Sequence, residues 1–207
     1  MVADPESDAE LMLRVKRGDL TAFEVLVEKY QQPITNLIAR TLNDPVEAED
    51  LAQNVFIQVY RSAHRYQAVA KFSTWLYTIA RNLCLNEIRR RARHPAEPLD
   101  PGMPADEEHL QRQIPDVQTQ APPEALLRVE LEQKVQQALA SLPENQRLSI
   151  LLYQEEDLSY DEISQVLGCS LSATKSLIHR GRETLKEMLK PYLRLGKWPG
   201  PPDAPQL

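Results

Sequence analysis

The segment "LSYDEISQVLGCSLSATKSLIHRGRETLKEML", residues 158–189, contains two stretches of helical periodicity separated by a glycine. Ser159 is followed three residues later by Glu162, which is the S-x-x-E pattern of a helix capping box. The first stretch ends at Gly168, and Ser170 is a suitable cap for the longer stretch that follows. Two helices joined by a short glycine-containing turn, with the second helix basic, predict a helix-turn-helix.

The second helix of this motif has two chemically different faces when its residues are placed 100° apart. The face expected to pack in a core comprises Leu171, Thr174, Ile178, Gly181, Leu185, Leu189 and Tyr192. The opposite face can hydrogen-bond base edges in a major groove and comprises Ser172, Ser176, His179 and Arg180. Between them lies a strip of cations where a phosphate backbone would run: Lys175, Arg182 and Lys186. The alternative is an amphipathic surface helix whose polar face is only solvated.

A second stretch, "KFSTWLYTIARNLCLNEIRRRAR" at residues 71–93, predicts another helix with an unusual stripe. Its core-facing flank is formed by Leu76, Ile79, Ala80, Leu83 and Cys84. Beside that flank run Trp75, Asn82, Asn86, Arg89 and Arg93. This stripe suits single-stranded nucleic acid, because a ring stacks on a base, amides hydrogen-bond base edges and arginines bind phosphates. A solvated helix face with a buried Trp75 is the alternative.

Charge is distributed unevenly along this chain of 207 residues, whose formal net charge is −6. Residues 96–123 contain six acidic side chains and one basic one, a local charge of −5, together with many prolines. Residues 171–194 contain six basic and two acidic side chains, a local charge of +4. The acidic proline-rich segment therefore predicts a linker, and the basic segment predicts a nucleic-acid partner.

The periodicity predicts an all-α fold with two small helical domains, at residues 8–94 and 124–194, joined by a linker at 95–123 and followed by a Pro-rich tail at 195–207. Helical spacing links Leu11, Val15, Phe23, Leu26 and Val27. We expect new helices to start at Pro33, after Asn43 and Asp44 at Pro45, at Pro123 and at Pro143. No segment alternates with period two for long enough to predict a sheet.

The sequence favours neither an enzyme nor a membrane protein. Cys84, Cys169 and the four histidines show no pair at metal-ligand spacing, so we expect no metal site and no disulfide. No Ser-His-Asp set or glycine-rich phosphate loop is present, so no catalytic residue and no cofactor are expected. The acidic N-terminus lacks the features of a signal peptide and no apolar run could cross a bilayer, so we expect a cytoplasmic location without membrane insertion.

Three segments together resemble a known family: "DPVEAEDLAQNVFIQVYRSAHRY" at 44–66, "FSTWLYTIARNLCLNEIRRR" at 72–91 and the helix-turn-helix segment at 158–189. In this order they are similar to regions 2 and 4 of extracytoplasmic-function (ECF) sigma factors of bacterial RNA polymerase. The resemblance implies that the first domain binds the clamp helices of the β′ subunit and melts the −10 promoter element. It implies that the second domain docks on the β flap and reads the −35 element. It also implies an anti-sigma factor as a partner, and no enzymatic activity.

The resemblance assigns roles to particular positions of this chain. Polymerase binding falls on Glu49, Asp50, Leu51, Gln53, Asn54 and Phe56. Together with the stripe, −10 DNA binding falls on Tyr66, Gln67, Lys71, Trp75, Asn82, Asn86, Arg89, Arg90 and Arg93. Together with the helix rotation, −35 DNA binding falls on Ser172, Lys175, Ser176, Leu177, His179, Arg180 and Arg182. Asn54 departs from the acidic residue usual in the family, which would weaken one polymerase contact without abolishing the surface. Thr174 and Leu177 also depart from the usual residues, so the −35 specificity of other members does not transfer.

Two other functions stay open on the sequence alone. A two-domain helix-turn-helix regulator would use its N-terminal domain to bind a small ligand or to dimerise. A helical scaffold or adaptor would leave the basic helix merely solvated. Transcription reconstituted with core polymerase separates these possibilities, because only a sigma factor confers promoter-specific initiation.

Overall fold

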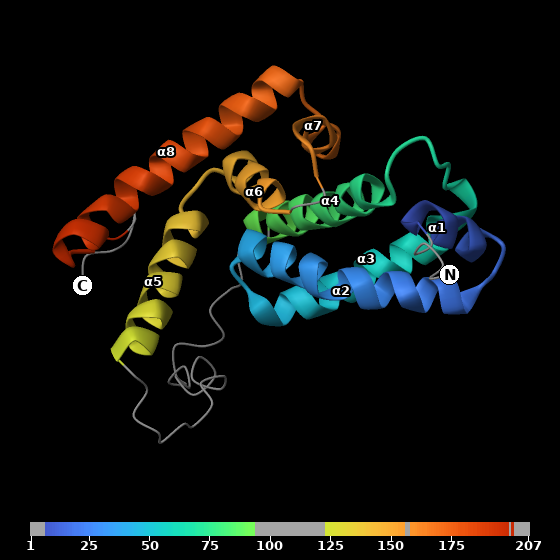
Figure 1. Cartoon of the computed structure of the whole chain (residues 1–207), viewed down its shortest axis with the longest axis horizontal. Coiled ribbons are helices and arrows are strands. Elements are labelled where there is room, and N and C mark those ends of the chain that lie inside the picture. Colours follow the sequence, from blue (N-terminus) through green and yellow to red (C-terminus); the bar gives the residue numbers. More distant parts are fainter. Residues whose placement is uncertain (1–6, 94–122, 156–157, 199, 201–207) are drawn as a thin grey trace, which may run out of the picture.

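The computed structural model describes residues 7–93, 123–155, 158–198 and 200, and these residues form helices with no strand among them (Figure 1). In chain order the elements are α1 (Asp8–Lys16), α2 (Leu20–Leu42), α3 (Pro45–Ser62), the short 3-10 helix η1 (Ala63–Arg65), α4 (Phe72–Arg93), α5 (Pro123–Ala140), α6 (Glu144–Tyr153), α7 (Tyr160–Leu167) and α8 (Leu171–Leu195). The all-α prediction is confirmed. The expected linker, apart from Pro123, and most of the expected tail lie outside the described residues.

The helix starts in the N-terminal region follow the sequence signals with one exception. Asp44 caps α3 by accepting a hydrogen bond from the backbone N–H of Glu47 at 3.1 Å, and Pro45 occupies the first turn, as predicted. The prediction that Pro33 starts a helix is wrong, because α2 continues through it from Leu20 to Leu42. Proline removes one backbone hydrogen bond from the helix. Tyr30 before it and Ile34 after it are both buried in the core, and this burial stabilises the continuous helix.

Helix α4 packs against α2 and α3 through the flank that its sequence predicts. Leu76, Ala80 and Cys84 are fully buried, while Ile79 and Leu83 are partly buried against the same core. Burial raises the pKa of the Cys84 thiol to about 12, so this thiol stays protonated and unreactive at neutral pH. Because α7 also packs on α4, the surface left to a partner is the strip that contains the exposed residues Asn82, Asn86, Arg89 and Arg93.

The helix-turn-helix prediction is confirmed in its details. Ser159 and Glu162 form the capping box of α7, and Gly168 ends that helix in the left-handed conformation with φ of 65°. The hydroxyl of Ser170 accepts a hydrogen bond from the N–H of Ala173 at 3.2 Å and so caps α8. Thr174, Ile178 and Gly181 are buried, as the rotation of α8 predicts, while Leu171, Leu185, Leu189 and Tyr192 of the same face are only partly buried.

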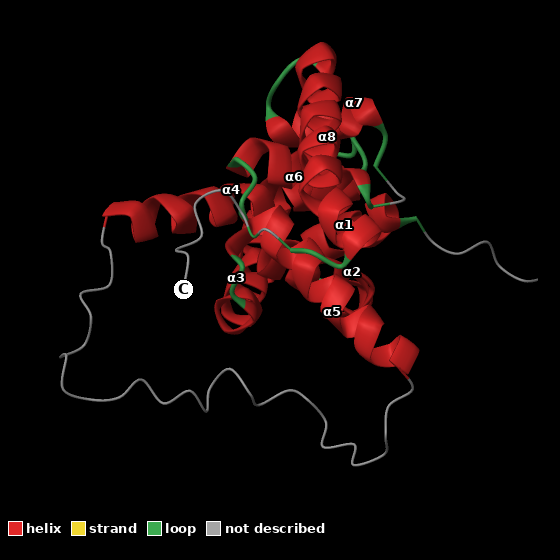
Figure 2. Ribbon diagram, turned by 90° about the vertical axis from the view of Figure 1, so that its left-hand side faces the viewer, coloured by secondary structure: helices red, strands yellow, loops and turns green. Residues whose placement is uncertain are grey.

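The C-terminal region packs directly on the N-terminal region, a contact that the sequence did not predict. Helix α6 lies against α2, and α7 lies against α4 (Figures 1 and 2). Leu148, Leu152 and Ile163 of the C-terminal region belong to the same buried apolar cluster as Ile38 and Leu76 of the N-terminal region. The two predicted domains thus share one hydrophobic core in this structure.

Candidate functional site

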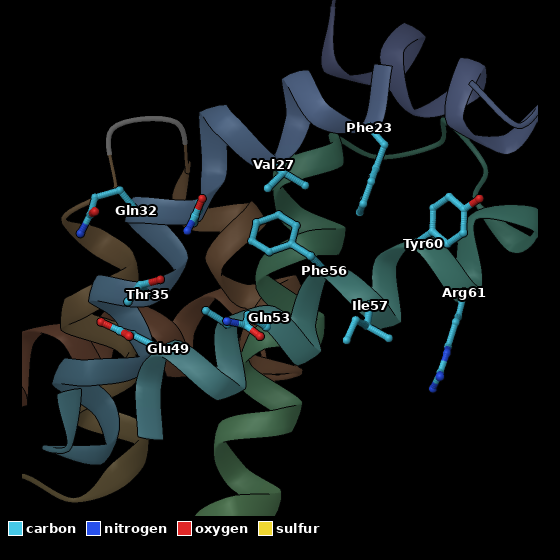
Figure 3. A pocket seen from close by; sticks show the side chains of 12 residues that line it. Phe23, Val27, Gln32, Thr35, Glu49, Gln53, Phe56, Ile57, Tyr60 and Arg61 are labelled. Carbon is cyan, nitrogen blue, oxygen red and sulfur yellow. The ribbon is translucent and has the colours of Figure 1, made fainter. Parts of the chain in front are cut away.

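A groove of about 730 Å³ lies between α2 and α3 (Figure 3). Figure 3 shows Phe23 and Val27 of α2 turned toward Phe56 of α3, and the rings of Phe23 and Tyr60 lie 5.3 Å apart. Polar side chains complete the lining: Gln31, Gln32, Thr35, Glu49, Gln53 and Arg61. An apolar floor with a polar rim is the composition of a site for another protein chain.

The predicted polymerase-binding residues divide into three groups around this groove. Glu49, Gln53 and Phe56 line it. Asp50 and Asn54 are exposed but lie on the side of α3 about 100° away from the line of Glu49 and Gln53. The remaining predicted residue, Leu51, is partly buried against the hydrophobic core and offers little surface.

Sequence reasoning predicted Phe56 but missed the other large apolar residues of the groove, Phe23, Val27, Ile57 and Tyr60. Phe23 and Val27 are spaced four residues apart on α2, as are Phe56 and Tyr60 on α3, so each pair shares one helix face. Ile57 and Tyr60 are 46% and 44% exposed, which is high for large apolar side chains. The i, i+4 spacing was visible in the sequence, but only the packing of α2 on α3 shows that both pairs meet in one groove.

The stripe predicted on α4 is exposed along most of its length. Asn82, Asn86, Arg89 and Arg93 are exposed, and neither arginine forms an ion pair with the other described residues. Trp75 is partly buried, with its ring 5.2 Å from the ring of Tyr66 and 6.1 Å from that of Phe72. Trp75 therefore rests on an aromatic cluster and keeps part of its surface accessible.

Tyr66 does not lie where the sequence prediction placed it. Its side chain is 3% exposed and packs against Phe72 and Trp75, so in this structure it presents no surface to DNA. Burial raises the pKa of its phenol, and its backbone carbonyl accepts a hydrogen bond from Nζ of Lys16 at 2.8 Å. The ring of Tyr66 packs against the buried side of Trp75. Gln67 and Lys71 of the same loop are exposed, as expected.

Arg90, predicted to bind DNA, is engaged within the protein. Its Nε and Nη2 donate to the two carboxylate oxygens of Glu87 at 2.7 Å each. Arg91 donates to Glu87 at 2.9 Å and to Asp44, the cap of α3, at 2.9 Å. Hydrogen bonds from Arg90 lower the pKa of Glu87, which is 7% exposed. Arg91 pairs with Asp44 and Arg90 lies 3.9 Å from Glu47, so the two arginines connect the C-terminal end of α4 to the N-terminal end of α3.

The predicted read-out face of α8 is exposed at Ser172, Ser176, His179 and Arg180. The strip of cations beside it is held by aromatic rings: Nζ of Lys175 lies 5.8 Å from the ring centre of Tyr160, and the guanidinium of Arg182 lies 5.7 Å from that of Tyr153. Lys186 is paired with Glu183 at 3.2 Å, which reduces the positive charge offered by that end of the strip. Leu177 is partly buried against the core.

The described ranges contain neither a candidate metal cluster nor a candidate membrane-spanning helix. No three histidine, cysteine, aspartate or glutamate side chains gather there in a way that could hold a metal ion. None of the helices described is both long and apolar enough to span a bilayer. The surfaces that stand out are therefore the groove and the two polar helix faces.

Comparison with protein families matches both regions of the chain. Residues 26–94 match the model of Sigma-70 region 2, and residues 132–185 match the model of Sigma-70, region 4. The first match contains α3, α4 and most of α2, which form the groove and the stripe. The second contains the helix-turn-helix.

Similar proteins extend over nearly the whole chain. The RNA polymerase sigma-H factor of Pseudomonas aeruginosa is 38% identical over 91% of this chain and 97% of its own length. The ECF RNA polymerase sigma factor SigW of Bacillus subtilis is 36% identical over 86% of this chain and 94% of its own length. The sigma factor RpoE of Bartonella quintana, solved in complex with the anti-sigma factor NepR, has the same fold with a TM-score of 0.61. It is 22% identical to this chain, and the match covers 81% of this chain and 96% of RpoE.

The relatives decide between the functions that the sequence left open. Each relative aligns with both regions of the chain, which argues against a regulator with an unrelated N-terminal domain and against a helical scaffold. Both relatives carry the names of sigma factors. With two matching family models in the order region 2 and region 4, the chain belongs to the ECF RNA polymerase sigma factors.

Proposed function

We propose that this sigma factor binds core RNA polymerase through the α2–α3 groove and brings it to promoters in the cytoplasm. The groove is the observation on which the proposal chiefly rests, because it joins an apolar floor to a polar rim on the surface where Glu49, Gln53 and Phe56 were predicted to bind polymerase. Its length along two helices suits a helical partner, such as the clamp helices of the β′ subunit. The β flap would contact the C-terminal region.

The two polar helix faces would bind promoter DNA. On α8, His179 and Arg180 point away from the core and can reach base edges of the −35 element, while Lys175 and Arg182 flank them at the phosphates. On α4, Asn82 and Asn86 would read bases of the melted −10 strand, and Arg89 and Arg93 would bind its phosphates. Trp75, with Gln67 and Lys71 of the preceding loop, would border the place where an unpaired base stacks. The two DNA surfaces thus belong to different regions of the chain.

An anti-sigma factor is the further partner that we propose. RpoE of Bartonella quintana was solved with the anti-sigma factor NepR and has the fold of this chain. A partner of that class would compete for the surfaces that polymerase uses.

Transcription reconstituted from purified components tests the proposal. Bacterial core polymerase, this protein and a library of duplexes with randomised −35 and −10 segments are mixed, and the run-off transcripts are sequenced. We expect transcripts from a defined subset of the library that depend on the protein. A transcript pool that is the same with and without the protein, in the presence of active core polymerase, would contradict the proposed function.

A further inference from the structure

A small concavity of about 200 Å³ lies where α3 ends and η1 begins. It is lined by Gln58, Arg61, Ser62, His64 and Arg65. Both arginine side chains are exposed, and no ion pair between the described residues includes either of them. Figure 3 shows the side chain of Arg61 turned away from Phe23 of α2. The concavity therefore presents two guanidinium groups that no described carboxylate neutralises, which suits an anion.

A histidine holds one of these guanidinium groups in place. Nε of Arg65 donates to Nε2 of His64 at 3.2 Å, so Nε2 is the acceptor and the ring proton lies on Nδ1. Nδ1 lies 3.0 Å from the backbone carbonyl oxygen of Arg61 and donates to it. The imidazole is therefore neutral. It fixes the Nε edge of the Arg65 guanidinium and leaves the terminal nitrogens of that group able to donate to a ligand.

Hydrogen bonds cover part of the negative end of α3. The unpaired carbonyls of the last turn of a helix repel an anion, and the concavity lies at such an end. Here the hydroxyl of Ser62 donates to the backbone carbonyl of Gln58, and the imidazole of His64 donates to that of Arg61. Two carbonyls beside the concavity are thus already hydrogen-bonded, which reduces the repulsion that an anion meets there.

The concavity lies next to the loop end of the α4 stripe. Tyr66 follows Arg65 directly in the chain, so their Cα atoms are about 3.8 Å apart. The ring of Tyr66 packs against Trp75, the first residue of the stripe, with the ring centres 5.2 Å apart. The cations of α3 and η1 therefore continue the line of Trp75, Asn82 and the stripe arginines beyond the place proposed for a stacked base.

The sequence around the concavity contains no acidic side chain. No aspartate or glutamate occurs from residue 51 to residue 86, a range that includes most of α3, η1, the following loop and part of α4. The same range contains Arg61, Arg65, Lys71 and Arg81. In a chain whose net charge is −6, this segment is a local exception. A positive field that extends along several elements suits the repeated charges of a nucleic-acid strand better than a single carboxylate.

We propose that this concavity is an additional backbone-binding site for single-stranded DNA. It binds a phosphodiester group of the strand whose bases lie on the α4 stripe, beyond the base next to Trp75. Arg61 and Arg65 donate to the phosphate oxygens, and His64 is a positioning residue that acts through Arg65. The inference rests on the proposed function, since it extends the DNA surface of α4 onto α3 and η1.

Binding of the full-length protein to a labelled oligothymidylate tests this site, because backbone contacts depend neither on base sequence nor on a promoter. The affinity is measured by fluorescence anisotropy at several salt concentrations, without polymerase. Arg65→Ala is the informative variant, since Arg61 also lines the α2–α3 groove. It should lower the affinity several-fold at low salt. It should also reduce the slope of log affinity against log salt concentration by ~0.7, the value for one phosphate contact with a single strand.

Three further variants separate charge from geometry. Arg65→Lys retains the positive charge, so it should keep the salt slope while it loses part of the affinity together with the planar guanidinium. His64→Phe removes the acceptor that holds Arg65 and should lower the affinity without changing the slope. His64→Gln, whose side-chain oxygen can accept the same hydrogen bond, should restore part of that loss. Arg128→Ala, which changes an exposed arginine of α5, is the matched control and should alter neither quantity.

Two results would overturn the inference outright: no binding of oligothymidylate by the parent protein at low salt, or the affinity and slope of the parent in Arg65→Ala. Titration of Arg65→Ala with core polymerase, without DNA, should give the affinity of the parent. A loss of affinity there, with oligothymidylate binding unchanged, would assign the concavity to an acidic segment of polymerase instead. If the parent binds oligothymidylate through Arg65 but directs no initiation in the reconstituted assay, the single-strand site stands and the proposed function fails.

Discussion

Arg180 and Lys186 are six residues apart on α8, yet their predicted roles differ. Arg180 lies on the exposed read-out face, whereas Lys186 lies in the strip of cations and is paired with Glu183. Arg180→Ala should therefore relax sequence preference at the −35 element, at a cost of ~1–3 kcal/mol for a lost bidentate base contact. Lys186→Ala should weaken all sequences alike. Titration of matched and mismatched −35 duplexes measures both effects. If Arg180→Ala lowered the affinity for the two duplexes equally, Arg180 would contact phosphate rather than a base.

Glu87 predicts how stability depends on pH. Its hydrogen bonds from Arg90 and Arg91 hold its pKa below the ordinary value of 4.5 in the folded protein. A carboxylate with a depressed folded pKa stabilises the fold above its unfolded pKa, and that contribution is lost as pH falls through the folded value. Glu87→Gln should thus cost about 1 kcal/mol at pH 7, the lower end for hydrogen bonds to charges because Arg90 is largely solvated.

Denaturant unfolding of the parent and the Glu87→Gln variant at pH 7 and at pH 3 measures this contribution. The difference in free energy of unfolding between the two proteins should shrink at pH 3, because this pH lies below the ordinary pKa of 4.5, so the unfolded carboxyl is protonated and part of the stabilisation is lost. A difference that is the same at both pH values would show that Glu87 acts through its shape rather than through its charge.

Single residues also mark where sequence reasoning failed. Rotating a helix or reading a family motif assigns a residue to a face, but it does not show what another element places on that face. Tyr66 is buried because the rings of Phe72 and Trp75 of α4 pack against it. The guanidinium of Arg90 hydrogen-bonds the carboxylate of Glu87, which lies one turn earlier on α4. Asn82 and Arg180 are exposed, as the rotation of their own helices predicts, while their roles toward DNA stay predictions.

At the scale of elements, the α2–α3 groove makes a prediction for polymerase binding. Ile57→Ser with Tyr60→Ser should weaken binding to core polymerase by at least tenfold, because these half-exposed side chains form much of its apolar surface. Asp50→Ala with Gln53→Ala should weaken it less, since only Gln53 lines the groove. Gln58→Ala, an exposed change on α3 outside the groove, is the control.

Fluorescence anisotropy of labelled protein titrated with core polymerase measures these affinities, and circular dichroism verifies that helix content is unchanged. Unaltered affinity of the Ile57 and Tyr60 variant would exclude the groove as the polymerase site.

The contact between α6 and α8 depends on a glycine. A Cβ atom at Gly181 would lie 2.5 Å from Cδ1 of Ile150, closer than side chains approach in folded proteins. Gly181→Ala should therefore destabilise the protein by ~1–3 kcal/mol through overpacking. Ile150→Val removes that methyl group, so the double variant should be more stable than Gly181→Ala alone. Thermal unfolding of the parent, the two single variants and the double variant gives a double-mutant cycle. If the losses in free energy of unfolding of the two single variants simply added in the double variant, a steric cause would be contradicted.

The beginnings and ends of helices were predictable wherever a local chemical signal specifies them. The Ser159–Glu162 box, the left-handed Gly168 and the Asp44-Pro45 start depend on residues within one turn of each other. Pro33 misled the prediction because a core stripe on both sides of it outweighs one missing hydrogen bond. The groove could not be located from the sequence, since it depends on how two helices pack.

For the whole molecule, the shared core predicts cooperative unfolding. Regions that bury each other's apolar surface lose that burial together, so the chain should unfold in one calorimetric transition with equal calorimetric and van't Hoff enthalpies. A variant with Tyr77→Phe and Glu162→Gln loses the hydrogen bond from Tyr77 to Glu155 and the ion pair of Glu162 with Lys71, so it should broaden or divide this transition. Two well-separated transitions in the parent protein would show that the regions are independent. The sequence did not predict this contact because each apolar face could be accounted for within its own domain.

The accessible position of the α2–α3 groove has a kinetic consequence. A protein whose binding surface forms only in a rare conformer has its observed affinity reduced by the population of that conformer. Here every molecule presents the groove, so the first encounter with polymerase should proceed at the full diffusional and orientational rate.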